Sequence, residues 1–213
     1  MQHLKNIEKL FSKNFIESPL VDTFDAGKIN ITSGSLVASD PLTTSEMQAF
    51  DTKFPLGEFP VLIHKEIESN CIAYVEIIFK NEKPAKWKMA TTKDQNLEDL
   101  DGEEIFGYPS ESGMGCLMDW EAQKSLQNLE QKIYQEKGEQ FCGIYEEFFR
   151  PAFFNKDEAA ADQFAILQPN LEDKSTILAF ETGYGDGFYA SYIAFDKDEN
   201  PLKIITEFIE IDA

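Results

Sequence analysis

The stretch that most limits the fold is the C-terminal part of the chain, where short apolar runs alternate with turn residues. After residue 163 these runs are Phe164–Leu167, Ile177–Phe180, Phe188–Phe195 and Leu202–Ile209. Each has the length and the β-branched or aromatic content of a strand, and each is too short for an ordinary helix. The polar connector 196–201 predicts an antiparallel hairpin between the last two runs. A chain that ends in this way favours a mainly antiparallel sheet.

The preceding part of the chain adds further strands and an N-terminal helix. Phe59–Ile67 and Cys71–Phe79 are strand-like runs, and the turn residues 68–70 between them predict a second hairpin. The second run is apolar on both faces apart from Glu76, which is typical of a central strand. Residues 3–16 space their apolar side chains as an amphipathic helix does.

The clearest helix begins after Asp119. Its predicted apolar stripe follows helical spacing and consists of Ala122, Leu126, Leu129 and Ile133. Aspartate is a preferred N-cap and glycine a preferred C-terminal stop, so Asp119 and Gly138 mark the two ends. A second helix is expected over Phe141–Phe149 and should stop at Pro151, because proline cannot donate the helix hydrogen bond. The prediction is an α+β fold: a mainly antiparallel β-sheet with a few flanking helices, in a single domain over residues 1–213 with its N-terminal helix within 1–20.

The charge of the chain argues against some functions and favours others. Its 213 residues include 19 Lys and Arg and 39 Asp and Glu, a formal net charge of −20. Such a protein repels phosphate backbones and anionic lipid head groups, so direct binding to nucleic acid or to a membrane is not expected. Cationic protein partners and metal cations remain compatible with this charge.

The cysteines and the N-terminal segment indicate a compartment. Cys71, Cys116 and Cys142 are an odd number of well-separated residues without a C-x-x-C pair, and they are expected to be buried free thiols. The N-terminal segment lacks the continuous apolar core of a secretion signal, and no apolar run is long enough to span a membrane. A cytoplasmic location is therefore expected.

The most unusual short segment is 182–189, which reads T-G-Y-G-D-G-F-Y. Three glycines around an aspartate suggest a phosphate-binding loop, a cation site or a tight bend. A phosphate-binding loop is followed by a helix, whereas the residues after Gly187 are aromatic and β-prone, so a bend is the favoured interpretation. Asp186 either caps this bend or points into a pocket, and Tyr184, Gly185 and Gly187 accompany it as candidate ligand-binding residues.

A second group of candidate residues lies upstream of the long helix. Gly113 and Gly115 flank the start of an apolar run that ends at Asp119, and Asp40 precedes a proline in a turn. Asp40, Asp119 and Asp186 together would supply the oxygen ligands of a hard cation, or a buried carboxylate for acid–base catalysis. The alternative is that each aspartate only closes a turn or caps a helix.

Other kinds of site find less support in the residues. A nucleophile pair of Cys116 and His64 is one interpretation, but an inert buried thiol and a strand histidine are favoured. Two histidines and three scattered cysteines give no zinc-binding spacing. The acidic connector 196–201 lacks the glycine and the glutamate of a calcium loop. The residue patterns therefore predict no particular metal or cofactor.

Four segments occur together in an order that resembles a known family. They are L-V-A-S-D-P-L from residue 36, F-P-L-G-E-F-P-V from residue 54, G-M-G-C-L-M-D from residue 113 and A-F-E-T-G-Y-G-D-G-F-Y from residue 179. This combination, over about residues 36–208, resembles the uncharacterised, mainly bacterial family called domain of unknown function 4241. The resemblance implies a shared fold but no reaction, cofactor or catalytic residue. The positions that it covers include Asp40, Gly113, Gly115, Asp119, Gly185, Asp186 and Gly187.

Two functions from different classes follow from these features. The first is a protein-interaction module that binds a cationic partner through its acidic surface, in the manner of an immunity or antitoxin protein. The second is a small-ligand or divalent-cation-binding domain, or a hydrolase, that uses Asp40, Asp119 and Asp186. The net charge and the lack of a catalytic motif favour the first. The residues leave open whether the chain is an enzyme and whether it forms oligomers.

Overall fold

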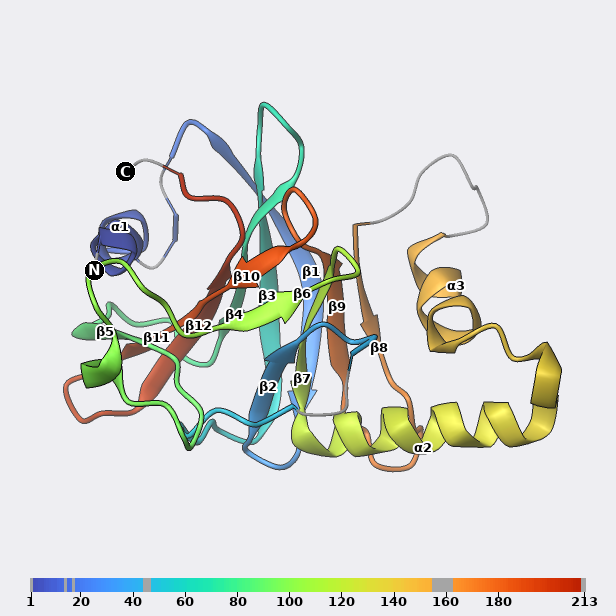
Figure 1. Cartoon of the computed structure of the whole chain (residues 1–213). Coiled ribbons are helices and arrows are strands. Elements are labelled where there is room, and N and C mark those ends of the chain that lie inside the picture. Colours follow the sequence, from blue (N-terminus) through green and yellow to red (C-terminus); the bar gives the residue numbers. More distant parts are fainter. Residues whose placement is uncertain (1, 14, 17, 44–46, 155–162, 212–213) are drawn as a thin grey trace.

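The computed structural model describes residues 2–13, 15–16, 18–43, 47–154 and 163–211 (Figure 1). The elements in chain order are α1 (Gln2–Leu10), β1 (Val21–Ile31), β2 (Leu36–Ser39), β3 (Gly57–Glu66), β4 (Ile72–Ile78), β5 (Lys86–Met89), the 3₁₀ turn η2 (Leu97–Asp99), β6 (Tyr108–Ser110), β7 (Met114–Asp119), α2 (Trp120–Lys137), the 3₁₀ turn η3 (Gly138–Gln140), the π-helical turn η4 (Tyr145–Phe149), α3 (Arg150–Phe153), β8 (Phe164–Leu167), β9 (Ile177–Glu181), β10 (Gly187–Tyr189), β11 (Ser191–Phe195) and β12 (Pro201–Glu207). This is the predicted α+β fold.

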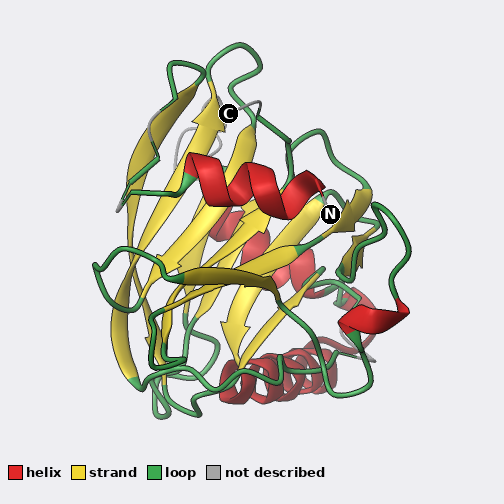
Figure 2. Cartoon of the chain, turned by 90° about the vertical axis from the view of Figure 1, so that its left-hand side faces the viewer, coloured by secondary structure: helices red, strands yellow, loops and turns green. Residues whose placement is uncertain are grey.

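The strands form three antiparallel sheets. The largest has six strands in the order β1-β3-β4-β12-β11-β5, the second has four in the order β2-β7-β9-β8, and β10 and β6 form a short ribbon. The two predicted hairpins, β3–β4 and β11–β12, are both present in the six-stranded sheet. Helix α1 lies across one face of this sheet, and the four-stranded sheet lies on its other side (Figures 1 and 2).

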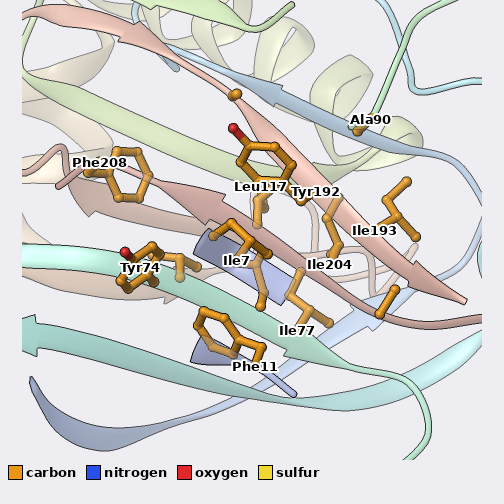
Figure 3. Close-up of a cluster of buried hydrophobic side chains, with 14 of the residues drawn as sticks. Ile7, Phe11, Tyr74, Ile77, Ala90, Leu117, Tyr192, Ile193, Ile204 and Phe208 are labelled. Atoms are coloured by element: carbon orange, nitrogen blue, oxygen red, sulfur yellow. The ribbon is translucent and has the colours of Figure 1, made fainter. Parts of the chain in front are cut away.

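Strand β7 is buried along its whole length because it lies between two hydrophobic cores. Side chains alternate between the two faces of a strand. Leu117 therefore points toward the six-stranded sheet, and it is one of the labelled side chains of this core in Figure 3. Cys116 and Met118 point the other way, toward the core formed with α2, η4 and α3.

Helix α2 begins and ends where the sequence predicts. The side chain of Asp119 caps it by accepting a hydrogen bond from Glu121 N, and Gly138 follows it with a φ of 55°. Within the predicted stripe Ala122 and Leu126 are buried, whereas Leu129 and Ile133 are only half-buried, because the C-terminal part of α2 extends beyond the sheet (Figure 1).

Three predictions about element boundaries are wrong. The N-terminal helix expected over residues 3–16 ends at Leu10. The helix expected to stop at Pro151 instead continues, because η4 runs directly into α3 and Pro151 lies in the first turn of α3. Proline fits there, since the N–H groups of a first turn need no acceptor within the helix. The expected single strand Phe188–Phe195 is divided at Ala190, and its halves β10 and β11 join different sheets.

The cysteines differ from one another in exposure. All three are free thiols, as predicted, but only Cys116 is buried, while Cys71 is half-buried and Cys142 is exposed. Cys142 lies in the connection after α2, where the chain packs against little else. The prediction of three buried thiols is therefore confirmed for Cys116 and wrong for Cys142, while Cys71 is only partly buried.

Candidate functional site

The glycine-rich segment forms a tight bend between β9 and β10, and a strand rather than a helix follows it, as predicted. Thr182 holds the bend together: its Oγ1 donates a hydrogen bond to Gly185 O at 2.8 Å, and Gly185 N donates one to Thr182 O at 2.6 Å. Tyr189 OH also donates to Gly185 O at 2.6 Å. Gly183 and Gly185 have φ angles of 44° and 109°, which side chains other than glycine's adopt at a cost. Asp186 is exposed at the outside of the bend.

A second glycine bend lies against the first. Thr182 N donates to Gly113 O at 3.0 Å, and a Cβ atom on Gly113 would lie 3.7 Å from the Cα atom of Gly185. The two bends form one wall of a hollow of about 420 Å³, which Leu42, Met114 and Tyr145 also line. We call it the glycine hollow. The structure thus brings together Gly113 and Gly185, two of the candidates from distant parts of the sequence.

Asp40 lies beside this hollow but is already engaged by the backbone. Its side chain is almost fully buried, at 1% exposure. Oδ2 accepts hydrogen bonds from Glu111 N at 3.0 Å and Ser112 N at 2.9 Å, and Oδ1 accepts one from Leu42 N at 2.9 Å. Asp40 therefore fixes the turn that leads into Gly113.

Asp40 also lines a second hollow of about 440 Å³ on the other side of this turn. We call it the acidic hollow, because Glu111, which is exposed, is its other charged lining residue. The remaining polar lining residues are Ser39, Thr43, Gln48, Thr92, Tyr108 and Gln95.

Asp119 lies at the far end of β7 and not at either hollow. Leu36 pairs with Asp119, whereas Ser39, the neighbour of Asp40, pairs with Cys116. The six residues of β7 span roughly 16 Å at about 3.3 Å per residue. Asp40, Asp119 and Asp186 consequently do not converge. Over the described residues, no group of three or more His, Cys, Asp or Glu side chains is placed to hold a metal ion.

The remaining candidates have contacts that are structural or lie at the surface. A Cβ on Gly115 would come within 2.4 Å of Tyr108 OH and 2.5 Å of Phe180 Cε2, so only glycine fits at this point of β7. A Cβ on Gly187 would meet the ring of Tyr189 at 2.7 Å. Tyr184 is 71% exposed, and its OH donates to Glu66 Oε2 at 2.8 Å.

Cys116 and His64 do not form a pair. The thiol of Cys116 donates to Ser39 O at 3.2 Å, and burial raises its pKa to about 12, so it stays protonated. His64 belongs to the other sheet, where Nδ1 contacts Thr23 Oγ1 at 2.8 Å and Nε2 contacts Glu76 Oε2 at 3.0 Å. The favoured interpretation of an inert thiol agrees with this geometry.

His64 is part of a buried polar chain that sequence reasoning missed. Glu76 Oε1 accepts a hydrogen bond of 2.5 Å from Lys203 Nζ, so the chain runs from His64 through Glu76 to Lys203. The three side chains are 0%, 0% and 1% exposed. Burial opposes ionisation of Glu76, but the hydrogen bond from His64 and the charge of Lys203 outweigh it, and the pKa of Glu76 lies below its usual value.

Helix α1 covers this buried chain. The ring of Phe11 packs edge-on against that of His64, with 5.6 Å between centroids. Ile7 and Phe11 lie among the buried side chains that Figure 3 shows near Tyr74. The signal in the sequence was a single charged residue, Glu76, in an otherwise apolar strand. Its partner could not be identified because Lys203 is 127 residues away along the chain.

The N-terminal end of α1 is held by a second set of charged groups. His3 Nδ1 lies 3.4 Å from Glu207 Oε2 and 3.6 Å from Glu210 Oε2. Burial raises the pKa of Glu207 to about 7, and the nearby charge of Glu210 adds to this, while His3 and a hydrogen bond with Tyr74 lower it. Tyr192 also faces Glu207 from β11.

This arrangement predicts a specific dependence of stability on pH. The folded state binds the Glu207 proton more tightly than the unfolded chain, since the pKa is about 7 against an ordinary value of 4.5. The stabilisation is present below about pH 4.5 and is lost as the pH rises through 7. The free energy of unfolding should therefore fall by up to about 3 kcal/mol over this interval through Glu207 alone. Urea denaturation of wild type and Glu207→Gln at a series of pH values measures it, and an identical slope in both proteins would contradict the assignment.

The class of protein is thus an antiparallel α+β protein. Two of its surface pockets, the glycine hollow and the acidic hollow, are lined by tight turns of the backbone. Among the helices in the described ranges, none is long and apolar enough to cross a membrane. The profile of the family described as "Protein of unknown function (DUF4241)" matches residues 29–206. The chain belongs to this family, as its four segments predict. No curated protein and no solved structure matches the chain.

Proposed function

We propose that this protein is an interaction module for a cationic protein partner, and that the acidic hollow receives a lysine or arginine side chain of that partner. The observation that carries the proposal is the charge of this hollow. Asp40 and Glu111 line it, and no Lys, Arg or His is among the described residues around it. A cation that enters meets the exposed carboxylate of Glu111 and neutral polar groups, with the buried charge of Asp40 behind them and no positive charge among the described lining residues.

The surroundings of the acidic hollow support the proposal. Gln95 lines the hollow and belongs to segment 93–104, which has six Asp and Glu side chains and a single Lys. Charges within a Debye length of about 8–10 Å add to the potential that an approaching cation meets. This segment would therefore raise the rate at which a basic surface associates. A chain of net charge −20 that masks a basic surface would act as an immunity or antitoxin protein does.

The competing proposal, a hydrolase or cation-binding domain that uses three aspartates, has less support. It requires the carboxylates to converge, and Asp119 lies at the opposite end of β7 from Asp40. The carboxylate of Asp119 is moreover occupied by backbone and hydroxyl donors from Thr32 and Ser33.

Glu111→Gln should weaken the binding of a cationic probe, and a tetra-arginine peptide is suitable. Glu111 is exposed at the hollow, so its loss removes a charge-assisted contact without removing the backbone contacts of Asp40. Loss of one hydrogen bond between charged groups is expected to weaken the affinity for the peptide about tenfold. Titration calorimetry at low salt gives the dissociation constants, which should also increase as sodium chloride is added.

The matched control is Glu136→Gln, which removes the same charge from the exposed C-terminal part of α2 and is not among the residues that line the acidic hollow. It should change the affinity little. Equal losses in the two variants would mean that only net charge matters and would reject the hollow as the binding site. An affinity that does not respond to ionic strength would reject the cationic partner itself.

A further inference from the structure

We propose that the protein also binds a small organic anion, in a third hollow beside β5 and β11, and that Glu199 occupies the position of the anionic group until the ligand displaces it. This hollow has a volume of about 560 Å³. Lys53 and Lys88 line it, together with Ile193, Phe195 and Glu199, and we call it the lysine hollow. It borders the same segment as the acidic hollow, since Thr91 and Leu97 line it while Thr92 and Gln95 line the acidic hollow, but no residue lines both, and it takes a ligand of the opposite charge.

Three lysines lie at or beside the lysine hollow, although Leu97 of the acidic segment 93–104 lies at its rim. Lys86 and Lys88 lie on one face of β5, because Trp87 between them points to the buried face. Together with Lys53, which also donates to Ser35 Oγ at 2.7 Å, they supply three ammonium groups around one region of an acidic chain. Partial desolvation, followed by the positive charge of Lys88, lowers the pKa of Lys86. An anion bound between these groups would relieve their repulsion.

Glu199 supplies the one carboxylate that both strand lysines contact among the described residues. It forms an ion pair with Lys86, and its Oε2 lies 3.5 Å from Lys88 Nζ. Glu199 lies in the turn between β11 and β12 with a φ of 65°, and Asp196 holds this turn by accepting hydrogen bonds from Asp198 N and Asn200 N, both at 2.8 Å. The side chain of Glu199 is 63% exposed, so it can leave the lysines without any change in the backbone of the turn.

The floor of the lysine hollow is apolar. Ile193 and Phe195 are 1% and 7% exposed, and Leu97 lies at the rim. Lys86 Nζ and Lys88 Nζ lie 5.7 Å and 5.5 Å from the centroid of the Phe195 ring, within the range of a cation–π contact. A ligand that fits these groups combines a phosphate or carboxylate, for the lysines, with a small apolar or aromatic part, for the floor.

The test uses two probes, phenyl phosphate and inorganic phosphate, titrated into the wild-type protein and followed by calorimetry. Phenyl phosphate should bind saturably and more tightly than inorganic phosphate, because only its ring can cover the exposed rim residue Leu97 and contact the edge of Phe195. Lys88→Met should weaken its binding about tenfold by removing a charge-assisted contact. Glu199→Gln should have the opposite effect and strengthen binding, because the competing carboxylate is gone.

The controls separate the hollow from a general effect of charge. Glu82→Gln removes an exposed carboxylate that pairs with Lys80 outside the hollow, and Lys124→Met removes an exposed lysine on α2. Both should leave the affinity for phenyl phosphate unchanged. The proposal is overturned if neither wild type nor Glu199→Gln binds phenyl phosphate saturably, if Glu199→Gln does not bind it more tightly than Glu82→Gln, or if Lys88→Met loses no more affinity than Lys124→Met.

Discussion

Replacement of Asp119 by alanine should lower the free energy of unfolding by about 3–5 kcal/mol. The carboxylate of Asp119 is fully buried and accepts hydrogen bonds from Thr32 N, Ser33 N and Glu121 N, each at 2.9 Å, and from the hydroxyls of Thr32 and Ser33. Loss of the helix cap costs about 1 kcal/mol, and each backbone N–H left buried without an acceptor costs about 1–3 kcal/mol more. Urea denaturation followed by circular dichroism measures the change.

Asp119 has this effect because it joins three elements, namely the end of β1, the end of β7 and the start of α2. A suitable comparison is Asp196→Ala, because Asp196 also accepts several hydrogen bonds but is only partly buried, in the turn between β11 and β12. Asp196→Ala should lower the free energy of unfolding by no more than about 1 kcal/mol, since water can accept hydrogen bonds from the donors that lose Asp196. If the two variants were destabilised equally, the burial of Asp119 would not be the reason for its importance.

The second large effect is expected at the buried chain under α1. Lys203→Met should destabilise the protein by about 3–5 kcal/mol, because it leaves the carboxylate of Glu76 in the core without a counter-charge. Lys203 Nζ contacts Glu76 Oε1 at 2.5 Å, and both side chains are excluded from solvent. Chemical denaturation at pH 7 is the appropriate measurement.

A double-mutant cycle distinguishes the loss of a charge pair from a loss of packing. Glu76→Gln combined with Lys203→Met removes both charges, while the new side-chain amide keeps an oxygen that can accept a hydrogen bond from His64. The double variant should be more stable than Lys203→Met alone, because the core no longer contains an uncompensated charge. Free-energy changes that simply add would show that the two groups do not interact, contrary to the contact between them.

The fold was predictable from the sequence wherever its information is local. The hairpin β3–β4 follows from two apolar runs around a short turn, and the limits of α2 follow from Asp119 and Gly138. The prediction was wrong where two segments that are consecutive in the sequence pair with different strands. The run Phe188–Phe195 has the pattern of one strand, but its first half pairs with β6 and its second half with β12 and β5.

The candidate site was predictable only in part, for a related reason. Asp40, Gly113 and Gly185 come from three separate segments, and the structure places all three near the same turn. Asp119, like Asp40, is an aspartate at the end of an apolar run, but it lies at the other end of β7, where it caps α2. A preference for Asp or Gly identifies a corner of the backbone, and it does not say which corners will be neighbours.

The sequence by itself determined the properties that depend on near neighbours and on composition: the strands and their antiparallel hairpins, the start and end of α2, the bend at 182–186 and the net charge of −20. The tertiary structure alone decided which residues meet across the molecule. It brings His64, Glu76 and Lys203 into one buried chain, separates Asp119 from Asp40, and gathers Lys53 and Lys88 around one hollow. The physical reason is that such contacts depend on which face each strand presents and on how two sheets and their helices pack together, and no local pattern specifies either.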